Sequence, residues 1–117
     1  MSELILLFKL IIGHALADFA LQNPDMAKYK NRHNKPDNVP PGQKTTPCWF
    51  YFLTAHALIQ GGTVWVITGM PIVGLAETVN HWLIDYLKCE NVTNPHVDQA
   101  LHIVCKLIYI LCIGILG

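Results

Sequence analysis

The chain has 117 residues, a length typical of a single domain. Hydrophobic residues make up 52% of it and charged residues only 14%, whereas a soluble domain usually carries about 25% charged residues. This shortage of charge predicts a protein for which lipid is part of the solvent. The formal net charge is zero, so the bulk composition provides no basic surface for nucleic acid, and we expect no nucleic-acid partner.

Four apolar stretches follow one another along the chain, at about 4–22, 49–68, 72–88 and 99–117. Each is close to the roughly 20 residues that a helix needs to cross the hydrocarbon core of a membrane. Helices are expected because backbone polar groups find no water in lipid and must be satisfied within the segment. The sequence therefore predicts an all-α fold: a single integral membrane domain, folded as a four-transmembrane-helix up-down-up-down bundle.

A flexible polar linker is predicted from 23 to 48, and its first part, Asp25 to Arg32, is a candidate for a short interfacial helix. The linker holds five of the eight Lys and Arg residues. Because basic residues are enriched in cytoplasmic loops, we expect the linker to be cytoplasmic and both termini to be extracytoplasmic. The second and third stretches are separated only by Gly69, Met70 and Pro71, which predicts a tight helical hairpin.

Ionisable side chains interrupt the apolar stretches at regular steps of four residues. Residues at this spacing lie on one face of a helix, so each set predicts a polar stripe. The stripes are His14 and Asp18, then His56 with Gln60, then Glu77, His81 and Asp85, and finally Asp98, His102 and Lys106. Lys88 extends the third stripe by three residues. In an up-down bundle the four histidines fall within about 8 Å in depth. The four histidines and four carboxylates are therefore expected to form one polar layer near the cytoplasmic face.

An ionisable group inside a bilayer costs about 2.5 to 3.5 kcal/mol on insertion scales, so these groups must pair, bind an ion or line water. A mixture of imidazole and carboxylate suits zinc, manganese or iron, and helical bundles commonly build such sites from facing helices. We expect one or two divalent ions. The candidate ligands are His14, Asp18, His56, Glu77, His81, Asp85, Asp98 and His102. A metal-free polar network and a proton or ion path are the alternatives.

The segments His14–Gln22, His56–Ile59, Glu77–Lys88 and Asp98–His102 together resemble a family catalogued as domain of unknown function 3307. The resemblance covers nearly the whole chain. It implies a small membrane protein of bacteria or their phages, placed in the bacterial inner membrane, and it implies that these polar residues are the shared ones. The pattern is also loosely similar to membrane-bound metal-dependent hydrolases that gather His and Asp at helix ends, an analogy of architecture alone.

The first functional hypothesis is a membrane-embedded metal-dependent hydrolase acting on a lipid-linked or headgroup phosphate or ester. A bound metal lowers the pKa of its water toward neutrality and so supplies hydroxide. Glu77, Asp85 and Lys88 are the candidate catalytic groups, with Glu77 as a general base and Lys88 holding an anionic leaving group. The alternative is a non-enzymatic membrane protein that modifies or blocks an envelope process, in which the polar layer is structural. Membrane lipid, another membrane protein and a second copy of the chain are the expected partners.

Overall fold

The computed structural model describes residues 2–34 and 48–116, and every element in these residues is a helix, which confirms the all-α prediction. The elements are α1 (Glu3–Ala15), the π-helix η1 (Leu16–Ala20), α2 (Pro24–Tyr29), α3 (Trp49–Thr68), α4 (Pro71–Cys89) and α5 (Pro95–Leu116).

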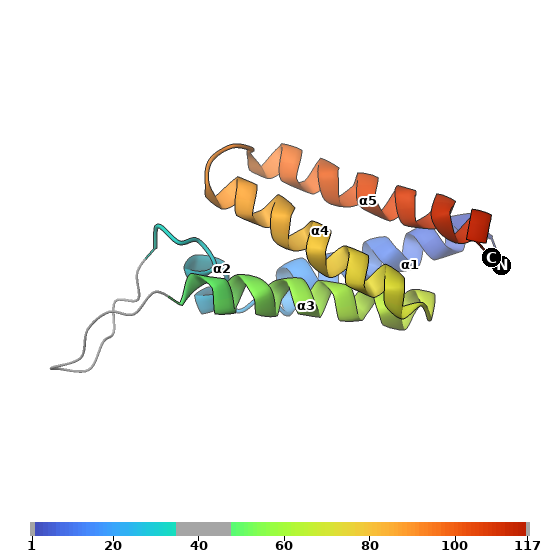
Figure 1. Ribbon diagram of the computed structural model, residues 1–117, viewed down its shortest axis with the longest axis horizontal. Coiled ribbons are helices and arrows are strands. Elements are labelled where there is room, and N and C mark those ends of the chain that lie inside the picture. Colours follow the sequence, from blue (N-terminus) through green and yellow to red (C-terminus); the bar gives the residue numbers. More distant parts are fainter. Residues whose placement is uncertain (1, 35–47, 117) are drawn as a thin grey trace, which may run out of the picture.

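The four long helices lie side by side, and both termini lie at the same end of the molecule (Figure 1). We call this the terminal end; the linker end carries α2, the start of α3 and the turn between α4 and α5 (Figure 1). Helix α1 contacts α3 and α5, and α4 contacts the same two helices, so the four helices form a closed ring. This arrangement brings one face of every long helix to a shared interior.

The helix boundaries follow from capping chemistry. Gly69 ends α3 with φ of 71°, a left-handed conformation that costs glycine little, and Pro71 opens α4 at a position where its missing N–H is not needed. Asn94 precedes α5, and its side chain accepts a hydrogen bond from the backbone N–H of Val97 at 2.9 Å. Asn23 caps α2 in the same manner.

Two predicted boundaries were wrong. The first helix was expected to run unbroken from 4 to 22, but α1 ends at Ala15, and the π-helix η1 that follows ends at Ala20. The Gln22 side chain donates to the Asp18 carbonyl. The fourth helix was expected from 99 but begins at Pro95, because a proline fits the first helical turn and Asn94 caps it. Residues 35–47 of the predicted linker lie outside the described residues.

Two glycines let α3 and α4 approach closely. A Cβ atom placed on Gly61 would lie 1.8 Å from the Thr78 hydroxyl and 2.6 Å from the Gly74 carbonyl oxygen. A Cβ atom on Gly74 would likewise lie 2.7 Å from the Gly61 carbonyl oxygen. The two backbones are therefore nearly in contact, which brings the polar stripes of α3 and α4 together one to two turns further along.

The interior and the surface of the bundle have an inverted polarity. Large apolar side chains are exposed along the long helices, including Val66 at 83% and Ile115 at 84%, whereas the buried set is rich in charged and polar residues. Helices α3 and α5 are long and apolar enough to cross a membrane, judged by length and composition. Helix α1 has only 13 residues, and α4 carries Glu77, Asp85 and Lys88.

Candidate metal centre

The polar stripes of the four long helices meet in one buried layer. All eight predicted ligands are buried, with exposed fractions of 7% or less. His56 lies seven residues after the start of α3, and His102 lies seven residues after the start of α5. The earlier start of α5 therefore improves the agreement in depth that the sequence predicted. The eight residues are His14, Asp18, His56, Glu77, His81, Asp85, Asp98 and His102.

Four of these residues converge at the centre of the layer, and we call them the primary cluster: Asp18, His56, His81 and Asp85. The Nε2 atoms of His56 and His81 lie 3.1 Å apart. Asp18 Oδ1 lies 3.1 Å from His56 Nε2 and 3.8 Å from His81 Nε2. Asp85 Oδ2 approaches the same two nitrogens at 3.4 and 3.8 Å. Two imidazoles and two carboxylates thus direct ligand atoms at one another from η1, α3 and α4.

These spacings approach those of a divalent transition-metal site. Ligand atoms bound tetrahedrally at about 2.0 to 2.1 Å from zinc lie about 3.3 Å apart. Asp18, His56 and His81 have ligand atoms within 4.8 Å of one another, and the spacings that involve the two imidazole nitrogens range from 3.1 to 3.8 Å. Asp85 Oδ2 is a fourth candidate ligand atom, which the Lys30 ammonium contacts at 2.7 Å. Two nitrogens and two oxygens form a donor set that suits zinc, iron or manganese.

A second group of ligand atoms adjoins the first, and we call it the secondary cluster: Asp85, Asp98 and His102. Their ligand atoms lie within 4.8 Å of one another, and His102 Nε2 is 3.4 Å from Asp98 Oδ1. Buried polar groups normally have a hydrogen-bond partner. Yet Asp85 Oδ1, Asp98 Oδ1 and His102 Nε2 are buried without one. Asp85 belongs to both clusters: its Oδ2 faces the primary cluster, and its Oδ1 has no hydrogen bond but forms an ion pair with the Lys88 ammonium at 3.2 Å.

Glu77 lies on the terminal-end side of His81, and its carboxylate contacts nitrogen atoms of two side chains. Its Oε1 atom is 2.7 Å from the Lys106 ammonium and 3.2 Å from His81 Nδ1. His81 in turn stacks on His102 with ring centroids 4.0 Å apart. Glu77 therefore fixes the ring orientation of His81, a common arrangement behind metal-binding histidines. Its remaining oxygen, Oε2, is buried without a hydrogen-bond partner.

His14 reaches the primary cluster through an intermediate side chain. Its Nε2 atom lies 3.0 Å from Gln99 Oε1, and the Gln99 amide nitrogen donates to Asp18 Oδ2 at 2.9 Å. The direct distance from His14 Nε2 to Asp18 Oδ2 is longer, 3.8 Å. The structure thus places His14 in the layer but gives it a closer partner, Gln99, whose role the sequence analysis missed.

Two lysines border the clusters at the linker end. Lys30, which directly follows α2, is buried and its ammonium lies 2.7 Å from Asp85 Oδ2. Lys88 lies 3.2 Å from Asp85 Oδ1 and 3.4 Å from Asp98 Oδ2. In the sequence Lys30 was interpreted only as a linker charge. Its spacing of four residues from Met26 was a usable signal, because residues at this spacing share one face of a helix. Both residues are buried in the structure and mark the inward face of α2.

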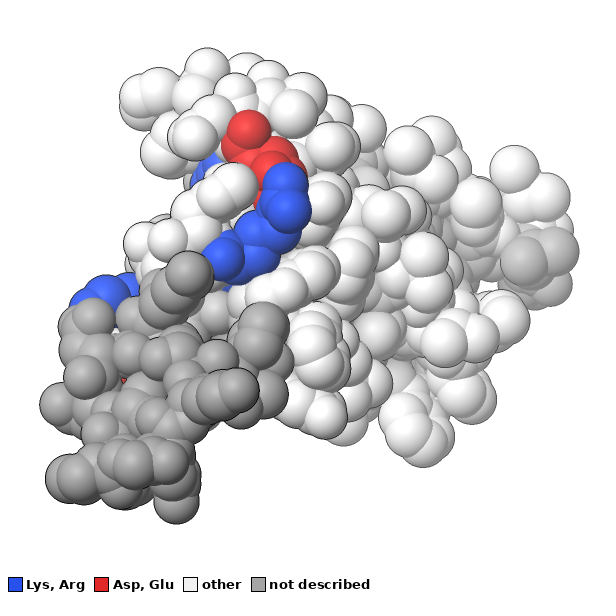
Figure 2. Space-filling view, turned by 60° about the vertical axis from the view of Figure 1, so that its left-hand side comes forward, with Lys and Arg blue, Asp and Glu red and all other residues white. Residues whose placement is uncertain are grey.

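On the face shown in Figure 2, the charged side chains of the described residues gather at the linker end, and the other described residues visible there are uncharged. The Arg32 guanidinium forms a two-pronged ion pair with Glu90 in the turn after α4, with Nη2 to Oε2 at 2.9 Å. His33 Nε2 lies 3.1 Å from the same carboxylate. The hydrogen bond from Arg32 is the largest of these influences, and it lowers the pKa of Glu90 to about 2.

The sequence of residues 6–116 matches the family described as "Protein of unknown function (DUF3307)", so the chain belongs to that family. The match confirms the resemblance drawn from the polar segments. No curated protein and no solved structure matched the chain.

Proposed function

We propose that this protein is a metal-dependent hydrolase embedded in a membrane, and that its centre is built on the primary cluster. The single observation that carries the proposal is the convergence of His56, His81, Asp18 and Asp85 on spacings of 3.1 to 3.8 Å in a fully buried layer. The inverted polarity of the bundle supports four membrane-spanning helices around that layer, since lipid is the solvent that favours exposed Val66 and Ile115.

A divalent zinc, manganese or iron ion held by the primary cluster would supply hydroxide at neutral pH and neutralise negative charge on a substrate. Asp98 and His102 lie beside this position, with ligand atoms within 4.8 Å of Asp85. Glu77 is better placed to orient His81 than to act as the general base that the sequence suggested, because Lys106 already occupies its Oε1 atom.

Phosphate ester hydrolysis is the reaction that the surrounding charges favour. Water adds to phosphorus, the bond from phosphorus to the alcohol oxygen breaks, and that oxygen takes up a proton. Asp85 Oδ1 is the acceptor for the proton of the water, and Lys88, 3.2 Å away, donates to the departing oxygen. Lys30 and Lys88 together provide the positive charge that a phosphate requires. Both lie at the linker end, where a phospholipid headgroup or an isoprenoid phosphate would reach them.

The alternative is a structural role for the polar layer in a protein that modifies an envelope process. The ion pairs of Lys106 with Glu77 and of Lys30 with Asp85, both at 2.7 Å, favour this alternative, because they satisfy two carboxylates without a metal. Ion conduction is disfavoured: between the layer and the terminal end, the core consists of Leu10, Val64, Val73, Tyr109 and Ile110, which offer no continuous polar lining.

Metal content of the protein purified in detergent without chelator tests the proposal. We expect at least one equivalent of zinc, manganese or iron in the wild type and its loss in His81→Ala. Trp82→Ala is the matched control, because Trp82 faces away from the layer and donates to the Thr54 hydroxyl. The metal-loaded protein should release inorganic phosphate from vesicles containing phosphatidic acid or an isoprenyl diphosphate, and Asp85→Asn should not. A wild type without stoichiometric metal would favour the structural alternative.

A further inference from the structure

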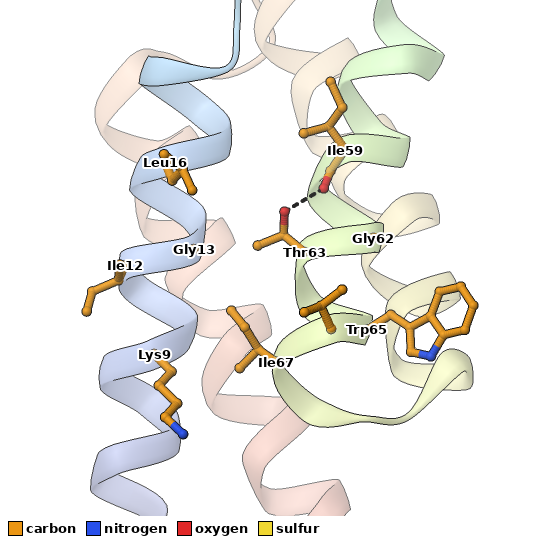
Figure 3. A pocket seen from close by; sticks show the side chains of 10 residues that line it. Lys9, Ile12, Gly13, Leu16, Ile59, Gly62, Thr63, Trp65 and Ile67 are labelled. Atoms are coloured by element: carbon orange, nitrogen blue, oxygen red, sulfur yellow. Dashed lines mark hydrogen bonds between the residues drawn. The ribbon is translucent and has the colours of Figure 1, made fainter.

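A groove of about 710 Å³ runs between α1 and α3, and none of the eight candidate ligands lines it (Figure 3). Its volume lies within the range of about 300 to 1,000 Å³ typical of small-molecule sites. The lining is aliphatic on both walls, with Ile12 and Leu16 from α1 and with Ile59 and Ile67 from α3. The Thr63 hydroxyl, which also lines the groove, donates to the Ile59 carbonyl at 2.8 Å and offers the groove little polarity.

Lys9 supplies the one charge in the lining of this groove. Its side chain is exposed and extends from α1 toward α3, where Ile67 points back across the gap (Figure 3). Among the described residues Lys9 has no ion pair or hydrogen bond. A lysine on a lipid-facing helix normally extends toward the headgroups, and Lys9 lies six residues from the start of α1, at the terminal end. Its ammonium is therefore available to a negative partner such as a lipid headgroup.

We propose that this groove binds an anionic phospholipid, with an acyl chain along the aliphatic walls and the headgroup phosphate on Lys9. The aliphatic lining matches a hydrocarbon chain, and the single ammonium at the end of the groove nearer the membrane surface matches one phosphate. Gly13 and Gly62 shape the groove in different ways. Gly13 lets α1 approach α3, since its Cβ atom would lie 2.6 Å from Ile67 Cδ1, and a Cβ atom on Gly62 would meet nothing within 4 Å.

Native mass spectrometry of the full chain in detergent, with equal amounts of phosphatidylglycerol and phosphatidylcholine, tests the proposal. We expect Lys9→Gln to lower the ratio of phosphatidylglycerol to phosphatidylcholine adducts about five-fold, the equivalent of about 1 kcal/mol for one basic residue at an anionic surface. Lys28→Gln removes the same charge from the exposed surface of the linker end and should change the ratio less than two-fold. Gly62→Leu fills the open groove and should reduce adducts of both lipids.

Two results would overturn this site. In the first, Lys9→Gln changes the adduct ratio no more than Lys28→Gln does, so the groove has no preference for negative charge. In the second, Gly62→Leu leaves the lipid adducts unchanged and removes a dimer peak, which would identify a second copy of the chain as the occupant. Neither result depends on the metal content of the protein, so the test is independent of the proposed hydrolase.

Discussion

At the scale of single residues, the ion pair between Lys106 and Glu77 shows how the interior tolerates charge. Both side chains are buried, at 0% and 1% exposure, and their charged atoms lie 2.7 Å apart. Removing one member of a buried pair leaves an unpaired charge and typically costs about 3 to 5 kcal/mol. Replacing both members with apolar or neutral groups is far less costly, because no charge then remains in the interior.

We therefore expect Lys106→Met to lower the free energy of unfolding in detergent by about 3 kcal/mol, and Lys106→Met/Glu77→Gln to recover much of that loss. Lys9→Met is the control, because Lys9 is exposed on α1 and should tolerate the same change with little effect on unfolding. Additive losses in the double variant would show that the two charges do not stabilise each other.

Glu90 offers a test by pH outside the helices. Arg32 and His33 hold the pKa of its carboxyl at about 2, below the ordinary value of 4.5. A carboxyl with a lowered folded-state pKa contributes stability above pH 4.5, and this contribution is lost as the pH falls toward 2. The Glu90 side-chain carbonyl resonance should titrate near pH 2 in the wild type and at a higher pH in Arg32→Gln, where only His33 still contacts the carboxylate. A midpoint near 4.5 in both proteins would mean that the ion pair does not form in solution.

The residues that could be identified from the sequence are those that recur at a regular spacing along one helix. Spacing by four residues placed His14, Asp18, His81 and Asp85 correctly in the layer because a helix turns by a fixed angle per residue. Lys30 was missed as a member of the site because its partner, Asp85, lies 55 residues away, and no periodicity connects a linker with a distant helix. The partner of Lys106 was missed for the same reason.

At the scale of elements, neighbouring glycines on α3 have opposite roles. A side chain on Gly61 would collide with Thr78 and with the α4 backbone, whereas one on Gly62 would meet nothing within 4 Å. Gly61→Ala should therefore destabilise the protein by about 1 to 3 kcal/mol through overpacking. Gly62→Ala should stabilise it by about 0.5 to 1 kcal/mol, because alanine favours a helix more than glycine does. Thermal unfolding in detergent compares the two variants, and equal effects would contradict the close approach of α3 and α4.

The π-helix η1 was not predictable from the sequence. Its residues, Leu16 to Ala20, include no proline or glycine, so the pattern indicated a continuous α-helix. In the structure the Leu21 N–H donates to the Leu16 carbonyl, five residues back, at 2.9 Å. Asp18 lies within this wider turn, and its Oδ1 lies 3.1 Å from His56 Nε2. Such π-turns commonly occur at functional sites, and this one helps to complete the primary cluster.

At the scale of the whole molecule, the common depth of the polar residues and the inverted polarity were predictable. The apolar stretches have the length of a bilayer, and their polar residues lie at similar distances from the helix ends. These two features predicted that the charged side chains are buried inside the bundle, as they are in the structure. The common end for both termini follows from an even number of antiparallel helices, of which α3–α4 and α4–α5 are joined by short turns and α1–α3 by the long linker. How closely the helices approach one another could not be derived, because it depends on local contacts such as that of Gly61 with Gly74.

The orientation in the membrane is the remaining prediction at this scale. Lys28, Lys30 and Arg32 lie at the linker end, whereas Lys9 is the basic residue nearest the terminal end, so the linker end should face the cytoplasm. Because the four native cysteines are free, they can be replaced, and single cysteines can be introduced at Ser2, Lys28 or Val92.

A membrane-impermeant maleimide applied to intact cells should label Ser2→Cys, whereas Lys28→Cys and Val92→Cys should react only after the cells are permeabilised. Ser2 is exposed at the terminal end, and Val92, 68% exposed in the turn after α4, reports the linker end independently of the linker itself. Labelling of Lys28→Cys and Val92→Cys alone would reverse the orientation while keeping the four-span bundle. Labelling of all three from outside would mean that the bundle does not cross the membrane, and the exposed apolar surface would then require another protein to cover it.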